Sequence, residues 1–234
     1  MNNLNNFQLN NDGNFDTNLS DHSVETAIGV SVYFREIENR LLKHIEDADA
    51  VFGAVAWLTN DAILNALASL SNVSIIVQKE DFLRPDTGTS DDWKAELRKK
   101  YSKLRCNLNR YAFKNILSSM SVACDPSIDA VRCVGNHNRD KKPAFPRMHN
   151  KFLIFAKVLP ASNECESEII EPYAVWTGSF NFTKNATNSL ENALYITEPS
   201  IVKAFFDEYG QIAAMSEPLD WTSDWAEPEW RIGT

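Results

Sequence analysis

The fold is decided by the stretch Met148-His149-Asn150-Lys151-Phe152-Leu153-Ile154-Phe155, which joins a polar segment to a continuous apolar run. An apolar run of this length after polar residues predicts a buried strand. Alternate residues of a strand share one face, so His149 and Lys151 should point the same way. We therefore expect an imidazole and an ammonium group side by side where a core strand begins.

A second polar pair follows another apolar run, Ala174 to Trp176. Here Ser179 and Asn181 stand two residues apart, after Gly178, and repeat the spacing of the first pair. Together the pairs supply one nucleophilic imidazole and three groups that can donate hydrogen bonds to the oxygens of a tetrahedral phosphate. Two plainer interpretations stand beside this one: His149 is a core residue, or Gly178-Ser179 is a turn before a helix that Ser179 or Thr183 caps.

The two motifs together resemble the phospholipase D superfamily, whose signature is HxK(x)4D followed by GSxN. The matching residues are His149, Lys151, Gly178, Ser179 and Asn181. Glu191 resembles the acid that hydrogen-bonds the catalytic histidine of this family. The chain departs at Ala156, where the family has an Asp that is usually read as structural. The resemblance covers about residues 26–213 and implies a phospholipase D-like fold.

This resemblance implies phosphodiester hydrolysis through a phosphohistidine, without a metal ion or another cofactor. The implied catalytic residues are His149, Lys151, Ser179, Asn181 and Glu191. The family uses two His-x-Lys motifs in one site, whereas this sequence contains only one. We therefore expect a homodimer whose two-fold axis brings a second copy of the motif into the same site.

Positive charge is concentrated in front of the first motif. Residues 91–151 hold 14 of the 23 Lys and Arg but 6 of the 32 Asp and Glu, a local net charge of +8 in a chain of net charge −9. A basic surface that leads to a phosphate-directed site suits a polyanionic substrate such as nucleic acid. The candidate phosphate-binding residues are Arg139, Lys141, Lys142 and Arg147, although solvated surface charge explains each of them equally well.

Apolar periodicity predicts an α/β fold, with a mixed, mostly parallel sheet flanked by helices on both faces. Helical patterns precede strands at residues 50–58 and 73–77, and Thr59 or Asn60 should cap the second helix. A charged helix is expected over residues 91–104 with Trp93 facing inward. The remaining expected elements are strands at 107–113 and 193–197, a short helix at 183–190 and a closing helix at 201–215.

Three regions are expected along the chain. Residues 1–25 are rich in Asn and predict a flexible tail, and residues 26–215 form the catalytic domain. Residues 216–234 carry five acids and three tryptophans and predict an acidic tail, for which packing on its own domain is the preferred interpretation.

Several classes of protein are disfavoured by composition. No apolar run reaches the ~18 residues of a membrane span, and the first residues lack the pattern of a signal peptide, so we expect a cytoplasmic protein without a membrane partner. The four cysteines are expected to be reduced thiols. Zinc binding by Cys106, Cys124, Cys133 and His137 is the less favoured alternative, because their spacing fits no common zinc motif.

The favoured function is a nuclease that cleaves DNA or RNA. A phospholipase D-type lipid hydrolase is the first alternative, although no amphipathic lipid-docking segment is evident. A catalytically inactive protein that binds nucleic acid or another protein is the second. By family resemblance alone, a bacterial restriction or antiphage role beside a partner ATPase is also expected.

Overall fold

The structure is a computed structural model, and it describes residues 20–79, 92–120, 125–135, 147–161 and 167–219. Three predicted phosphate-binding residues, Arg139, Lys141 and Lys142, lie outside these ranges. So do Cys124, Cys165 and His137, and most of the two predicted tails.

The described strands form one mixed sheet of eight strands, in the order β1-β7-β6-β5-β2-β3-β4-β8. Only the β2–β3 and β3–β4 pairs are parallel. The predicted mixed α/β sheet is confirmed, but the expected majority of parallel pairs is wrong, because β5, β6 and β7 form an antiparallel meander beside β2. The strands are β1 (Val30–Tyr33), β2 (Ala50–Val55), β3 (Asn72–Gln78), β4 (Val131–Val134), β5 (Lys151–Leu159), β6 (Ile169–Gly178), β7 (Ala193–Ile196) and β8 (Glu217–Pro218).

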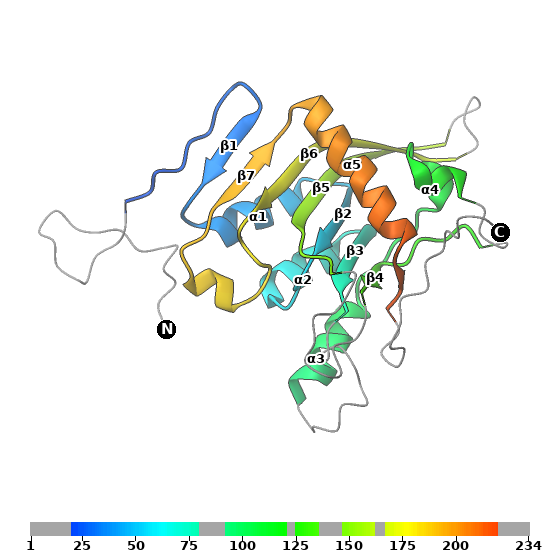
Figure 1. Cartoon of the computed structure of the whole chain (residues 1–234), viewed down its shortest axis with the longest axis horizontal. Helices are drawn as coiled ribbons and strands as arrows, with labels where there is room; N and C mark the ends of the chain where they lie inside the picture. The colour runs from blue at the N-terminus through cyan, green and yellow to red at the C-terminus, as the bar shows by residue number, and fades with distance from the viewer. Residues whose placement is uncertain (1–19, 80–91, 121–124, 136–146, 162–166, 220–234) are drawn as a thin grey trace, which may run out of the picture.

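Helices cover both faces of this sheet, as expected. In Figure 1, α5 crosses the near face, whereas α1 and α2 lie behind the strands. The helices are α1 (Ile37–Glu46), α2 (Asp61–Ser69), α3 (Asp92–Tyr101), α4 (Ile116–Ser119) and α5 (Pro199–Ala214), with 3-10 helices η3 (Arg110–Ala112) and η4 (Asn185–Asn188). None of these described helices has the length and apolar character that a membrane crossing requires.

Side chains of the central strands alternate between two apolar layers. Val51 and Val55 of β2 enter the layer under α1 and α2, whereas Phe52 enters the layer under α5. β5 alternates in the same way, with Phe155 on the first side and Phe152 on the second. This alternation places the side chains at positions 149 and 151 on the α1/α2 side of the sheet.

Several local predictions can be compared with these elements. Asn60 caps α2, since its Oδ1 accepts from the backbone N–H groups of Ala62 at 2.9 Å and Ile63 at 3.1 Å. Trp93 is 49% exposed, so its expected inward position is wrong. The strand expected at 107–113 is wrong as well, because this segment contains η3 and its Asn109 cap. The strands β1 and β4 were not predicted.

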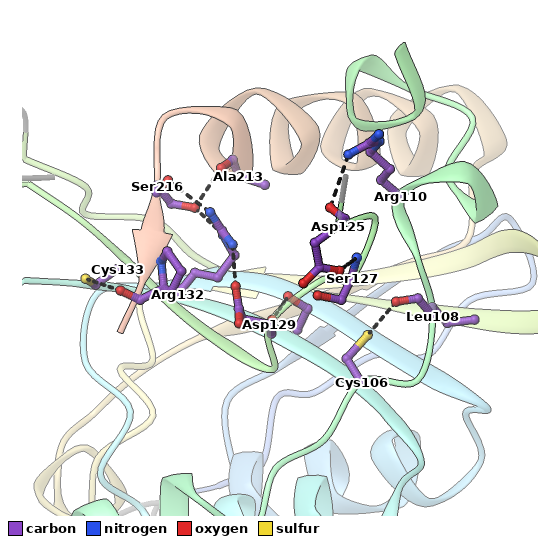
Figure 2. A network of polar contacts seen from close by, with 12 residues as sticks. Cys106, Leu108, Arg110, Asp125, Ser127, Asp129, Arg132, Cys133, Ala213 and Ser216 are labelled. Atoms are coloured by element: carbon purple, nitrogen blue, oxygen red, sulfur yellow. Dashed lines mark hydrogen bonds and ion pairs between the residues drawn. The ribbon is translucent and has the colours of Figure 1, made fainter. Parts of the chain in front are cut away.

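A buried polar network fastens the end of α5 to the edge of the sheet (Figure 2). Arg132 on β4 donates to the Ser216 hydroxyl at 2.7 Å, to the Ser216 carbonyl at 3.0 Å and to Asp129 at 2.7 Å. Beside it, Lys79 and Glu217 form a buried ion pair with 2.6 Å between Nζ and Oε1. Because β8 pairs with β4, the sheet extends past the domain boundary expected at residue 215.

Candidate active site

The polar residues of both sequence motifs lie at the ends of central strands, along the side of the sheet that we call the sheet edge below. β2 and β6 end at this edge, where β5 and β7 begin, since Val55 pairs with Lys151, and Gly178 pairs with Ala193. β3 runs parallel to β2 and ends there too, at Gln78. Segments far apart in the sequence therefore meet at a single place.

Backbone contacts hold the segment that carries His149. The carbonyl of Asn150 accepts from the N–H of Ala56 at 2.8 Å, which continues the β2–β5 pairing beyond the strands. One residue before His149, the buried N–H of Met148 donates to the side-chain oxygen of Gln78 at 2.6 Å. These bonds fix the main chain on either side of His149.

His149 and Lys151 converge as their spacing predicts. Lys151 Nζ lies 3.4 Å from each ring nitrogen of His149 and donates to the His149 carbonyl at 3.2 Å. His149 is exposed and Lys151 is half-buried. The interpretation of His149 as a core residue is therefore wrong.

Ser179 and Glu191 form the second half of the site. The Ser179 hydroxyl donates to the Glu191 carboxylate and accepts from the backbone N–H of Asn192 at 3.1 Å. A second bond of 3.1 Å joins the Ser179 N–H to the Asn192 carbonyl. Gly178 lets the two segments approach, since a Cβ at this position would lie 2.8 Å from Ala193 Cα. Ser179 is therefore bound across the β6–β7 connection and does not cap a helix.

Glu191 is placed differently from its expected role. Its described hydrogen bond is to Ser179, and no bond to His149 of the same chain is present among the described residues. Burial lowers the pKa of Lys151, and the negative charge of Glu191 opposes part of this lowering. Glu191 thus links the two motifs electrostatically.

Asn181 lies beside this cluster with an unused acceptor. Its backbone carbonyl accepts from Thr183 N–H at 2.8 Å. Its side-chain Oδ1 is buried, and within the described ranges it has no hydrogen-bond partner. A buried acceptor without a partner is costly, so this atom suits a hydrogen-bond donor from outside the chain.

The surroundings of His149 favour the neutral form of its imidazole. Burial lowers the pKa of His149, and the positive charges of Lys151 and Arg147 lower it further. A neutral imidazole has the lone pair that a nucleophile requires. Arg147, an expected phosphate-binding residue, is exposed next to the site.

The sequence analysis did not assign two residues that the structure places at this site. Trp57 follows β2 and meets the His149 ring edge to face, with 6.1 Å between centroids and 84° between planes. Gln78 ends β3 and holds Met148. Both follow apolar strands directly, and polar or aromatic residues at the ends of neighbouring parallel strands are the signal that identifies them.

A pocket of about 780 Å³ adjoins the cluster. Asn181 and Glu191 belong to both, and Trp57 lines the pocket on the side of His149. The described residues contain no group of three or more His, Cys, Asp or Glu side chains placed to hold a metal ion, and Cys106 and Cys133 are not joined in a disulfide. The site offers a nucleophile, a cation and hydrogen-bonding groups, which together suit a phosphate ester.

Fold and site thus define an α/β protein with a polar cluster of His149, Lys151, Ser179 and Glu191 where neighbouring strands of its sheet begin or end. The sequence is 33% identical over 223 residues to uncharacterized protein L381 of Acanthamoeba polyphaga mimivirus, a match that covers 90% of this chain and 72% of the relative. This chain belongs to the family of that mimivirus protein. No model of a known protein family matches the chain.

Three solved structures are similar to this chain in outline. Nuc, a phospholipase D family member from Salmonella typhimurium, is 18% identical with a TM-score of 0.42 and covers 78% of this chain and 91% of its own. NucT from Helicobacter pylori is 16% identical with a TM-score of 0.45 and covers 78% of this chain and 93% of its own. TrmBL2, an archaeal chromatin protein, is 14% identical with a TM-score of 0.37 and covers 82% of this chain and 54% of its own.

Proposed function

We propose that this protein is a metal-independent phosphodiesterase, and more narrowly a nuclease, that works through a phosphohistidine at His149. The observation that carries the proposal is the convergence of Lys151 Nζ on both ring nitrogens of His149, beside the Ser179–Glu191 pair. This geometry matches the chemistry expected from the His-x-Lys and Gly-Ser-x-Asn motifs.

The reaction proceeds in two displacements. A neutral ring nitrogen of His149 attacks phosphorus, and the bond to the leaving oxygen breaks as a second imidazole, which starts in the protonated form, gives that oxygen a proton. The same second imidazole then takes a proton from water as the water oxygen attacks phosphorus. This attack breaks the bond between phosphorus and the His149 nitrogen and releases His149. Lys151, Ser179 and Asn181 stabilise the non-bridging oxygens in both steps.

A second copy of the chain supplies the second imidazole. The sequence contains one His-x-Lys motif. Of the other described histidines, neither His22 nor His44 is followed two residues later by lysine, and the ring of His44 is stacked on Tyr195 with 3.8 Å between centroids. A two-fold axis through the sheet edge brings a second exposed His149 into the same site. Leu190, 62% exposed next to Glu191, provides apolar surface for such an interface. Across this axis, Glu191 of one protomer orients His149 of the other.

Nucleic acid fits the site better than lipid. The pocket wall combines two tryptophans with Thr59, Thr183 and Lys184. An acyl chain cannot form hydrogen bonds or ion pairs with these three polar side chains. The basic segment that ends at Lys151 adds the positive charge that a polyanion requires, with Arg139, Lys141 and Lys142 as its proposed phosphate contacts. A cytoplasmic antiphage or restriction role beside a partner ATPase rests on family resemblance alone.

The test is an assay of the purified protein in EDTA against labelled single- and double-stranded DNA and RNA and against phospholipid vesicles. We expect cleavage of nucleic acid in EDTA and no release of lipid headgroups. Activity that vanishes on chelation and returns with Mg²⁺ or Mn²⁺ would contradict the mechanism. Headgroup release without nucleic-acid cleavage would establish the lipid hydrolase instead.

A further inference from the structure

The pocket beside the site has two aromatic walls from separate elements. Trp57 follows β2 and is 38% exposed, and Trp93 lies in the first turn of α3 and is 49% exposed. Both line the 780 Å³ pocket. Large aromatic side chains are usually covered, so two partly exposed indoles in one pocket indicate surface that is kept for a planar ligand.

The pocket is continuous with the proposed position of the phosphate. Asn181 and Glu191 line it and also belong to the catalytic cluster, and Trp57 contacts His149. A nucleotide whose phosphate is attacked by His149 therefore has its base one sugar away, within reach of the pocket. The volume of the pocket lies in the range that holds small ligands.

The polar part of the wall also suits a nucleotide. Lys184 lines the pocket and supplies an exposed positive charge that can pair with a backbone phosphate. The buried Oδ1 of Asn181, which lacks a partner in the described part of the chain, can accept from an exocyclic amino group or a sugar hydroxyl. An aliphatic ligand would leave this acceptor unpaired.

We propose that this pocket is a base-stacking subsite, in which Trp57 and Trp93 hold an unpaired nucleobase next to the scissile phosphodiester. The substrate class is therefore single-stranded nucleic acid. A base within a duplex has both faces covered by its neighbours, so it cannot enter the pocket without leaving the stack. This inference rests on the proposed function and narrows it.

The test measures binding, so that it does not depend on turnover. In a His149→Ala background, the affinity of a labelled single strand is measured by fluorescence anisotropy, and that of the same strand with abasic sugars is measured alongside. Trp57→Ala should weaken binding of the base-bearing strand by roughly 5- to 150-fold, the usual range for one stacked base, and leave the abasic strand nearly unchanged. Trp57→Phe should restore most of the affinity, since phenylalanine also stacks.

Tyr111→Ala is the matched control, because Tyr111 is 53% exposed on η3, whose neighbouring residues belong to the apolar layer under α5. It should change neither affinity. The subsite would be overturned if Trp57→Ala weakened binding of the base-bearing and abasic strands equally. It would also be overturned if the His149→Ala protein with Trp57 intact bound the two strands with equal affinity. If the wild type cleaves nucleic acid but Trp57→Ala does not selectively weaken binding of the base-bearing strand, the subsite alone is wrong. If Trp57→Ala does weaken that binding selectively and the wild type cleaves no nucleic acid, the subsite stands and the nuclease proposal fails.

Discussion

At the scale of single residues, the proposed phosphoryl transfer places one requirement on His149 and another on Lys151. The nucleophile must be neutral, and the group that holds the phosphate oxygens must be charged. The lysine meets its requirement and also helps the histidine, because a nearby positive charge disfavours protonation of the imidazole. Arg147 acts in the same direction from the preceding segment.

The pH dependence of activity should report this arrangement. Because burial and the two cations lower the pKa of His149, the acid limb of kcat/KM should have its midpoint below the ordinary histidine value of about 6.5. Arg147→Ala removes one cation, so the midpoint should rise toward that value. The control Lys203→Ala changes a remote charge on α5 and should leave the midpoint in place. A wild-type midpoint at or above 6.5, or one that Arg147→Ala does not move, would contradict the assignment.

The proposed catalytic residues and their neighbours differ in how far the sequence predicts their positions. Spacing of two along a strand predicts the convergence of His149 and Lys151, because the pattern is local. Gln78 and Trp57 reach the site only because β5 pairs beside β2, a neighbour relation that no local pattern contains. Trp93 follows the apolar periodicity of α3, but it stands at the pocket at the sheet edge, where it is not covered.

At the scale of elements, a buried ion pair and its neighbours hold the last strand. β8 contributes only two residues, too few to stay paired by backbone bonds alone. Lys79 and Glu217 are nearly inaccessible, with side chains 3% and 7% exposed, and the Arg132 network lies next to them. Lys79 directly follows Gln78, so the same polar cluster supports the segment that positions Met148 and His149.

Breaking this pair should be costly. Glu217→Ala leaves the Lys79 ammonium buried without its carboxylate and should lower the free energy of unfolding by about 3–5 kcal/mol. The double variant Lys79→Met/Glu217→Leu removes both charges and should lose clearly less. As a matched comparison, Asp207→Ala breaks the exposed Lys203–Asp207 pair and should cost at most about 1 kcal/mol. Urea unfolding measures all three; equal losses for Glu217→Ala and Asp207→Ala would show that the buried pair is not an anchor.

The elements that the sequence failed to predict are the short or irregular ones. β1 and β4 have four residues each and are interrupted by a polar residue, Ser31 or Arg132, whereas the equally short β7 is entirely apolar or aromatic and was predicted. The longer strands β2, β3 and β5, and the helices α1, α2 and α5, show strong apolar patterns and were predicted. Parallel and antiparallel pairing cannot be separated in this way, since buried strands of both kinds are continuously apolar.

At the scale of the whole molecule, the proposed mechanism requires a dimer, because the sequence contains a single His-x-Lys motif. Mixing His149→Ala protein with wild type, after subunit exchange, should give heterodimers that are inactive or nearly so. Activity should then fall faster than the wild-type fraction. Mixing with Lys203→Ala protein is the control and should leave total activity unchanged. Activity that falls in strict proportion to the wild-type fraction, or an active monomer in light scattering, would show that one chain carries a complete site.

The covalent intermediate is the most direct test of the proposed chemistry. A substrate labelled with ³²P at the scissile phosphate is mixed with the enzyme in EDTA, and the reaction is stopped with alkali, because phosphohistidine is lost in acid. We expect protein-bound label on the peptide that contains His149, its loss on acid treatment, and its absence from His149→Ala protein. Label on another residue, or turnover by His149→Ala protein in a clean preparation, would contradict the account.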